Sequence, residues 1–458
     1  MKIGFAVSDI TPELGIYLTG YGRPERLATG VHSPLTATAM VMNDHGREAV
    51  VIGLDWCFTD DPATREIRGE IARISGIPEP HILLCCSHTH SAPQTAYRRT
   101  LGRTAVDPEG KGIAYVRTSI PAIADAVLRA KSSLHEAEGG FAAGKTRTGV
   151  SRRGMDENGQ VRGFIADPDA MYDDNMTAVR FRDRETHEDI GILIHCSAHN
   201  TSMGANRNIS SDWCGIMRER LKQRYQAPVL FLNGAFGDVG PRTNRWMKID
   251  DGYSGYSAGG GDGPEAAAEV GFRAASDALR LLDGMRDFRT DLPLKLNCQT
   301  LRLPQEIHMT KAEAEEMIRR CTQSQEKGEE PPLELQLAES ALKAWGEPHQ
   351  PELILSQTLI AVGPLALAPF PFEMFSIFSL RLRKFGPFQY TLLCGNANGS
   401  FAYLPDRGAI ACGGYEVSCR KWTRPYVTKP EAGDLAVTQA LQGLREMQTE
   451  NCCRKKPD

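Results

Sequence analysis

Short apolar runs alternate with helix-forming stretches along most of this chain. The runs that we expect to form strands lie at residues 3–8, 36–42, 49–54, 81–86, 141–146, 176–181, 190–194, 229–232, 294–303, 353–367 and 390–394. The stretches that we expect to form helices lie at 62–75, 112–135, from near 212 to about 225, 264–284 and about 430–449. This alternation is typical of an α/β fold in which at least some strands are parallel. We therefore predict a mixed, partly parallel sheet or sheets flanked by helices.

The length and the local composition predict how the chain is divided. With 458 residues it exceeds the usual size of a single core, so one large elaborated domain or two domains are expected. We assign residues 1–450 to a single large domain and 451–458 to a tail. Residues 310–347 are charged and helix-forming, with breaks at Gly328 and Pro331-Pro332. They predict a helical hairpin, inserted at about 308–348, that has a solvated face and carries no chemistry.

Composition excludes several classes of protein. A net charge of -4 gives no reason to expect nucleic acid as a partner. No apolar stretch approaches 18 residues, and the first residues lack the apolar core of a signal peptide, so no membrane span or stable membrane anchoring is expected. The 12 cysteines are scattered without a CxxC pair, which argues against a thiolate zinc site. We expect reduced thiols and a cytoplasmic location.

The apolar run before residue 87 ends in Ser87-His88-Thr89-His90. Side chains alternate faces along a strand, so His88 and His90 point to the same side if the chain stays extended. Two imidazoles at the end of a strand are a natural start for a metal site. A pair of solvated or hydrogen-bonded histidines explains an isolated HxH equally well.

Other polar segments also follow apolar runs. The run 190–194 leads to His195 and His199, and either could be a metal ligand by spacing alone. In the turn Asn233–Pro241 the glycines would let backbone N–H groups approach a ligand, although the phosphate-loop pattern is absent. Glu373 follows another run, and we expect it in the first turn of a helix. Ligands of α/β sheets bind beyond the carboxyl ends of strands, so these segments predict one shared site.

Two loops are harder to interpret. Arg152 and Arg153 lie between glycines and could bind an anion or a polarised carbonyl, although such arginines are more often solvated. The sequence does not decide which of the two faces the site. The long loop at 250–264 could be a lid or a surface bulge.

Several segments occur in a characteristic order along nearly the whole chain. They are Asp9-Ile10-Thr11-Pro12, Gly30-Val31-His32, Ser87-His88-Thr89-His90-Ser91, Ala198-His199-Asn200-Thr201-Ser202-Met203, Asn233–Pro241, Phe372-Glu373-Met374, Tyr403 and Tyr415. In this combination the chain resembles the neutral, non-lysosomal ceramidases and their bacterial relatives. The resemblance implies an α/β catalytic domain that holds one zinc ion.

The resemblance also implies roles for individual residues. The implied zinc ligands are His88, His199, Glu373 and Tyr403. The implied substrate-facing or acid–base residues are His90, Arg152 and Tyr415. On this basis His199, rather than His195, is the second histidine ligand. A tyrosine ligand is less usual, and spacing alone would not have indicated Tyr403.

The expected activity is hydrolysis of an N-acyl amide bond in a small molecule by a zinc-activated water. Ceramidases have serine where this chain has Gly240, so we expect no acyl-enzyme. The chain ends after the last helix of the catalytic domain and shows no export signal, so long-chain ceramide is expected to be a poorer substrate than a soluble amide. Two alternatives remain: a zinc hydrolase acting on an ester, a lactone or a sugar-linked amide, and a non-catalytic zinc-binding protein.

Overall fold

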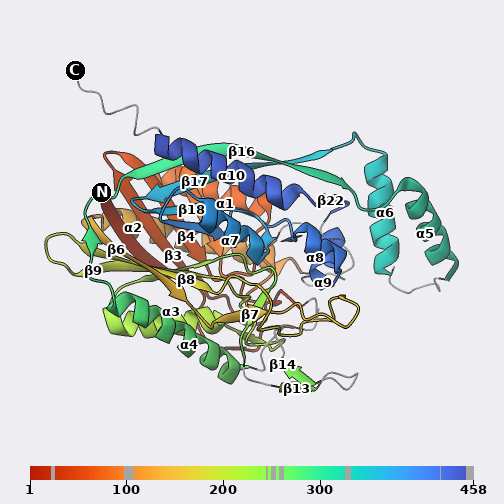
Figure 1. Cartoon of the computed structure of the whole chain (residues 1–458), viewed down its shortest axis with the longest axis horizontal. Helices are drawn as coiled ribbons and strands as arrows, with labels where there is room; N and C mark the ends of the chain where they lie inside the picture. The colour runs from red at the N-terminus through yellow and green to blue at the C-terminus, as the bar shows by residue number, and fades with distance from the viewer. Residues whose placement is uncertain are drawn as a thin grey trace.

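Two sheets form the centre of the molecule (Figure 1). The computed structural model describes residues 1–449 except 22–25, 97–106, 108, 244–245, 249–253, 257–262, 325–331 and 423. The larger sheet has the order β11-β9-β8-β6-β1-β3-β4-β5, and β15 also pairs with β6. Its strands are β1 (Lys2–Asp9), β3 (Thr36–Asp44), β4 (Arg47–Leu54), β5 (Ile82–Cys86), β6 (His135–Lys145), β8 (Asn175–Asp183), β9 (Asp189–Cys196), β11 (Val229–Asn233) and β15 (Phe288–Arg289).

The smaller sheet has the order β20-β18-β17-β16-β22. Its strands are β16 (Leu294–Ile307), β17 (Glu352–Val362), β18 (Leu365–Pro369), β20 (Tyr390–Cys394) and β22 (Tyr426–Thr428). The pairs β4–β5, β9–β11 and β18–β20 are parallel, and the other pairs within the two sheets are antiparallel. The predicted mixed α/β fold is therefore confirmed. β5 and β11 are buried along their whole length, as expected for parallel strands that are covered on both faces.

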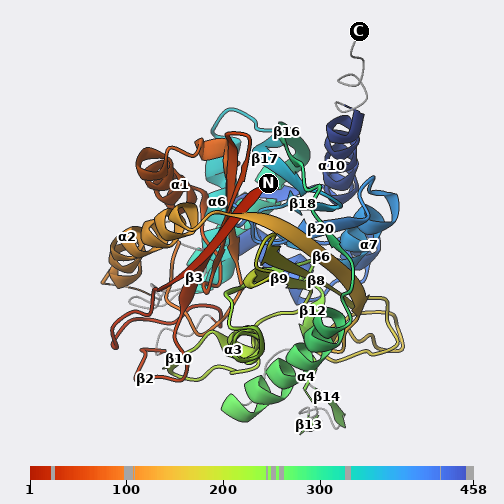
Figure 2. The ribbon, with the colours of Figure 1, turned by 90° about the vertical axis from the view of Figure 1, so that its left-hand side faces the viewer.

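Helices cover the outer faces of the two stacked sheets (Figure 2). Leucines of the larger sheet, among them Leu83 and Leu193, meet Ile360 and Leu392 of the smaller sheet in a common apolar core. The covering helices are α1 (Asp61–Ser75) and α2 (Lys111–Ser132), α3 (Asp212–Tyr225) and α4 (Pro264–Asp283), and α7 (Ser376–Phe385) and α10 (Ala432–Thr449). None of the described helices is long and apolar enough to cross a membrane.

The structure describes the predicted loop at 250–264 only in part and the predicted tail not at all. The stretch predicted as the loop 250–264 is not loop throughout: β13 (Trp246–Lys248) pairs with β14 (Ser254–Tyr256) across part of it, and much of the rest lies outside the described residues. The predicted tail 451–458 also lies outside them.

The region around 308–348 contains two helices, α5 (Lys311–Ser324) and α6 (Leu333–Trp345). Figure 1 shows them in teal, projecting beyond the ends of β16 and β17. They share a small apolar cluster of their own, built on Ala314, Ala338 and Ala341. The division into one domain with an inserted hairpin stays a prediction that can be tested directly.

Replacing residues 310–348 with a short glycine–serine linker should leave the rest of the chain folded. β16 and β17 already pair at Pro304 and Glu352, so the linker joins ends that lie side by side. We expect the midpoint of thermal unfolding to move by no more than about 2–4 °C, which corresponds to about 1 kcal/mol in a large domain. Circular dichroism measures this shift, and an insoluble or unfolded product would show that the hairpin belongs to the main core.

Candidate active site

The site forms where several strands end. His88 comes two residues after β5, His199 three residues after β9, and Phe236 three residues after β11. Glu373 follows β18 and lies in β19 (Glu373–Met374), which pairs with β21 (Tyr403–Leu404). The prediction that Glu373 lies in the first turn of a helix is wrong, because α7 begins only at Ser376. The short β19–β21 pairing aligns Glu373 directly with Tyr403 instead.

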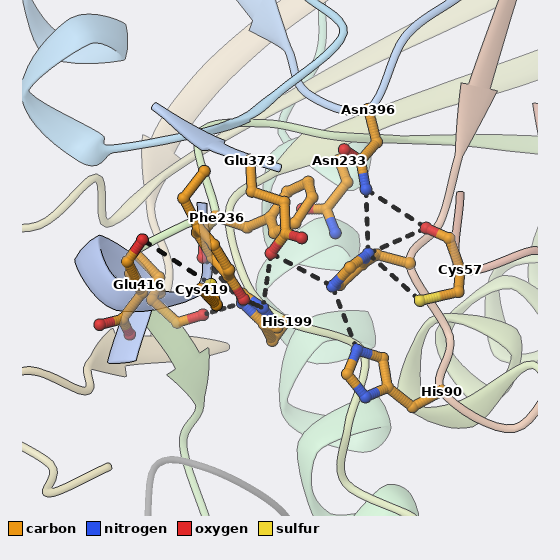
Figure 3. A network of polar contacts seen from close by, with 12 residues as sticks. Cys57, His90, His199, Asn233, Phe236, Glu373, Asn396, Glu416 and Cys419 are labelled. Carbon is orange, nitrogen blue, oxygen red and sulfur yellow. Dashed lines mark hydrogen bonds and ion pairs between the residues drawn. The ribbon is translucent and has the colours of Figure 1, made fainter. Parts of the chain in front are cut away.

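His199 and Glu373 lie close together at the centre of the site (Figure 3), and His88 completes a group of three possible metal ligands with them. One carboxylate oxygen of Glu373, Oε2, lies 3.5 Å from Nε2 of His88 and 3.2 Å from Nε2 of His199. All three side chains are buried, and their ligand atoms lie within 4.8 Å of one another. The backbone of His88 is left-handed, with φ 68°, so the HxH is not extended as assumed. The ring of His90 still reaches His88, with 3.1 Å between their Nε2 atoms.

The hydrogen bonds of the two rings fix which nitrogen carries the proton. Nδ1 of His88 lies 2.9 Å from the carbonyl oxygen of Cys57, and Nδ1 of His199 lies 2.8 Å from that of Phe236. A carbonyl oxygen only accepts, so we assign the proton to each Nδ1, which leaves the lone pair on each Nε2. The side-chain amide of Asn396 also lies 3.0 Å from Nδ1 of His88. Oε2 of Glu373 is buried and has no hydrogen-bond partner among the described residues.

Burial also keeps both rings neutral. It lowers the pKa of His88 even though Glu373 acts to raise it, and it lowers the pKa of His199 well below the ordinary value. The two imidazoles that face Oε2 of Glu373 are therefore neutral. Two nitrogen lone pairs and one carboxylate oxygen aimed at one point suit a cation, and a carbonyl behind each ring is the usual support of a metal-bound histidine.

Cys57, His88 and His90 form a second group of possible ligand atoms. In that group Nδ1 of His88 is already bonded to the Cys57 carbonyl, and its Nε2 is the atom that faces Glu373. The group of His88, His199 and Glu373 is therefore the better candidate.

Tyr403 and Arg152 extend the site on one side. The hydroxyl oxygen of Tyr403 lies 3.3 Å from Nε2 of His199, and Nη2 of Arg152 donates to it over 3.0 Å. Burial raises the pKa of Tyr403 well above the ordinary value, and the charge of Arg152 works in the opposite direction. Arg152 does not line the cavity described below, so it contacts the site through Tyr403.

Glu416 explains why two adjacent arginines are buried here. It accepts from Nε of Arg152 over 2.9 Å and from Nη1 of Arg153 over 2.6 Å, and all three side chains are buried. Arg153 also donates to the carbonyls of Ala409 and Gly413, away from Tyr403. Of the two arginines, Arg152 is thus the one beside the site. Sequence reasoning missed Glu416, which no local pattern distinguishes.

A cavity of about 160 Å³ opens beside the converging groups. His90 and Tyr415, both expected near the substrate, line it together with His88, Glu373 and Tyr403. The remaining wall combines three aromatic side chains with small, polar and charged residues: Thr19, Gly20, Cys57, Phe58, Asp60, Asp61, Ala96, Ser400, Phe401, Ala402, Cys419, Trp422 and Arg424. Gly20 has φ 101°, and a Cβ there would lie 2.3 Å from Cγ of His90, so this glycine lets the N-terminal loop close over the ring.

Two segments that the sequence highlighted do not contribute in the way expected. Nε2 of His195 donates to the carbonyl of Leu393 over 2.8 Å, and burial lowers the pKa of His195 to about 4. His195 is thus a neutral core side chain bonded to β20, and it does not belong to the group of possible ligands around Glu373. The N–H groups of Gly234, Gly237 and Val239 in the glycine-rich turn bond to protein carbonyls, so they do not approach a ligand.

Comparison with known proteins places the chain in a family. The sequence profile described as neutral/alkaline non-lysosomal ceramidase, N-terminal, matches residues 1–248, more than half of the chain. The chain belongs to this family. The matched part contains His88, His90, Arg152 and His199, and ends before Glu373. Membership implies a hydrolase that acts on amides.

Solved structures of ceramidases share the fold. The neutral ceramidase from Pseudomonas aeruginosa has a TM-score of 0.72 and 16% sequence identity, over 98% of this chain and 74% of that one. A ceramidase complexed with C2 gives the same TM-score and identity, over 98% and 75% of the two chains. No curated protein sequence matches this chain.

Replacing Glu416 with glutamine should destabilise the whole fold. The change leaves the guanidinium groups of Arg152 and Arg153 buried without their shared carboxylate, and breaking a buried pair in this way costs about 3–5 kcal/mol. Urea unfolding measures the loss, with the exposed Glu347→Gln as the matched control. An unchanged unfolding midpoint for Glu416→Gln would show that the arginines do not depend on this carboxylate.

Proposed function

We propose that this chain is a zinc-dependent amide hydrolase that cleaves the N-acyl bond of a ceramide-type amide. The observation that carries the proposal is the buried carboxylate oxygen of Glu373, which has no hydrogen-bond partner among the described residues and faces two neutral imidazoles beside a cavity. Two histidines and one glutamate are a common set of ligands in catalytic zinc sites. When bound, zinc supplies a Lewis acid and an activated water molecule.

Tyr403 is the proposed fourth protein ligand. Its hydroxyl oxygen is close to Nε2 of His199, and Arg152 donates a hydrogen bond to it. A buried phenol resists ionisation, and the adjacent guanidinium partly offsets that resistance by favouring the phenolate. Glu416 in turn fixes Arg152 in place. We therefore assign Arg152 the role of supporting Tyr403.

His90 and Tyr415 are the proposed substrate-facing groups. Burial and the neighbouring imidazoles lower the pKa of His90 well below the ordinary value, so the ring is neutral. A neutral imidazole beside the scissile amide can hydrogen-bond the substrate or the leaving amine. The ring of Tyr415 stands edge-on to that of Tyr403, with 6.1 Å between centroids, and lines the same cavity. A hydroxyl on this wall can hydrogen-bond the developing oxyanion.

Removing any of the three central ligands should strip the metal. In His88→Ala, His199→Ala and Glu373→Ala, we expect zinc affinity to fall by more than ~10–100-fold. That is the loss caused by removing a residue that only hydrogen-bonds to a metal ligand. His195→Gln keeps a donor for the Leu393 carbonyl and should retain the metal. Elemental analysis of the purified variants measures the zinc content. Full occupancy in His199→Ala, together with loss in His195→Gln, would refute this choice of ligands.

Short-acyl amides should be better substrates than long-chain ceramide. The cavity of about 160 Å³ is smaller than the ~300–1,000 Å³ of pockets that enclose a drug-sized ligand. We expect kcat/KM to be at least ~10-fold higher for a soluble short-acyl amide, which corresponds to about 1.4 kcal/mol of transition-state stabilisation. A panel of amides, esters and lactones, with and without chelator, measures this ratio.

The same panel separates the alternatives. Faster turnover of long-chain ceramide than of any soluble amide would contradict the size argument. Preference for an ester or lactone would favour the other hydrolase class. If zinc binds but no compound is hydrolysed, the chain is a non-catalytic zinc protein.

Hydrolysis should proceed by direct attack of water, without an acyl-enzyme. Gly240 offers no nucleophile, and Ser91, Thr201 and Ser202, which lie close to the histidines in sequence, are buried and do not line the cavity. The hydroxyls and thiols that do line it, besides the tyrosines, belong to Thr19, Cys57, Ser400 and Cys419, and an adduct on any of these would also contradict the water mechanism. A covalent route requires a nucleophile within reach of both the substrate and a base. Single-turnover hydrolysis in oxygen-18 water should label the acid product directly, and mass spectrometry of quenched enzyme should find no adduct. A trapped acyl-serine or acyl-threonine on the kinetic pathway would overturn this mechanism.

A further inference from the structure

The turn from Phe236 to Val239 contacts every group that the proposed function assigns to the metal except Tyr403. It leaves the end of β11 and leads into β12 (Val239–Pro241), behind the site rather than inside the cavity. Its contacts with the histidines come from carbonyls and one ring. The carbonyls of Phe236 and Val239 lie 2.8 and 3.1 Å from Nδ1 of His199. The ring of Phe236 packs on those of His88 and His199, with centroids 4.6 and 5.1 Å apart.

The same turn holds the segment that carries Glu373. The N–H of Gly237 donates to the carbonyl of Met374 over 2.8 Å. A Cβ at Gly237 would lie 2.5 Å from the carbonyl oxygen of Glu373, so this close approach requires glycine. The turn and the glutamate segment are thus in direct backbone contact.

Asp238 adds a side-chain contact to the same segment, three residues after Glu373. Its Oδ1 accepts from both the N–H and the hydroxyl of Ser376, each over 2.8 Å. Ser376 is the first residue of α7, and the residue before it, Phe375, provides no side-chain cap. A carboxylate at a helix N-terminus satisfies a donor that the helix leaves open and also suits the helix dipole. Asp238 therefore caps α7 from a distant part of the chain, three residues beyond Glu373.

We propose that Asp238 is a positioning residue for Glu373: by capping α7 it sets the carboxylate at the distance from His88 and His199 that metal binding requires. The inference rests on the proposed metal site. Asp238 does not line the cavity, so it does not act on the substrate directly. Its backbone carbonyl also accepts from the N–H of Arg152 over 3.0 Å, which links the same turn to the Arg152–Tyr403 pair.

The capping contact needs an acceptor more than it needs a full charge. Burial raises the pKa of Asp238 to about 7, so the neutral acid is readily populated near neutral pH. Asparagine at this position keeps an oxygen in place of Oδ1, whereas alanine removes it. The two substitutions therefore distinguish the capping contact from a general effect of changing a buried residue.

Zinc affinity of the whole chain, measured by competition with a chromophoric chelator, tests the inference without relying on turnover. We expect Asp238→Ala to weaken zinc binding by ~10–100-fold, as loss of an outer partner does, and Asp238→Asn to stay near the wild type. Ser376→Ala removes only the hydroxyl bond to Asp238, so its zinc affinity should lie between those of Asp238→Ala and Asp238→Asn. Thr310→Ala is the matched control, because the hydroxyl of Thr310 accepts from the N–H of Glu313 at the start of α5, in the hairpin that projects beyond β16 and β17. It should bind zinc like the wild type.

The visible spectrum of the cobalt-substituted protein adds a second measurement, since it reports ligand geometry. It should change in Asp238→Ala and be restored in Asp238→Asn. Wild-type zinc affinity and cobalt spectrum in Asp238→Ala would overturn the inference while leaving the metal site intact. If Asp238→Ala does not fold, the zinc affinity of Ser376→Ala becomes the test. Wild-type zinc affinity in Ser376→Ala would then overturn the inference. Absence of zinc binding in the wild type, or unchanged binding in Glu373→Ala, would instead overturn the proposed function.

Discussion

The structure depends on one buried carboxylate. Oε2 of Glu373 has no hydrogen-bond partner among the described residues, and the nearest side chains are two imidazoles that burial keeps neutral. Buried carboxylates are normally hydrogen-bonded, paired with a cationic group or bound to a metal. A cation between Glu373, His88 and His199 satisfies the carboxylate and both lone pairs at once.

Holding these atoms together requires unusual backbone. His88 has φ 68°, Asn396, which touches its ring, has φ 44°, and Ala402, next to Tyr403, has φ 63°. Left-handed residues other than glycine cost roughly 1–3 kcal/mol each and persist only where their surroundings enforce them. The surroundings here are the ends of β5, β18 and β20, the β19–β21 pairing and the turn at Phe236–Val239. The sheets fix the positions of the strand ends, and the short segments beyond those ends orient the side chains of His88, His199 and Glu373.

Sequence patterns located the frame and much of the site because both depend on local features. Apolar runs with polar ends predicted the strands, and the rule that ligands bind beyond strand ends predicted one shared site for His88, Glu373 and the segment that carries His195 and His199. The choice of His199 over His195 came from the family resemblance. Tyr403 needed the family resemblance, since a tyrosine in a loop has no distinguishing pattern. Glu416 and Asp238 act through contacts across some 260 and 140 positions, which no local signal encodes. The helix expected at Glu373 was wrong because pairing with Tyr403 overrides local preference.

The central claim is that one metal ion lies between His88, His199 and Glu373, and diffraction at the zinc absorption edge tests it most directly. Crystals of protein purified without added chelator should show a single anomalous peak bonded to Nε2 of both histidines and to Glu373, at the ~2.0–2.2 Å typical of zinc. A peak on Cys57 and His90 instead, or none at this position in fully folded protein supplied with zinc, would contradict it.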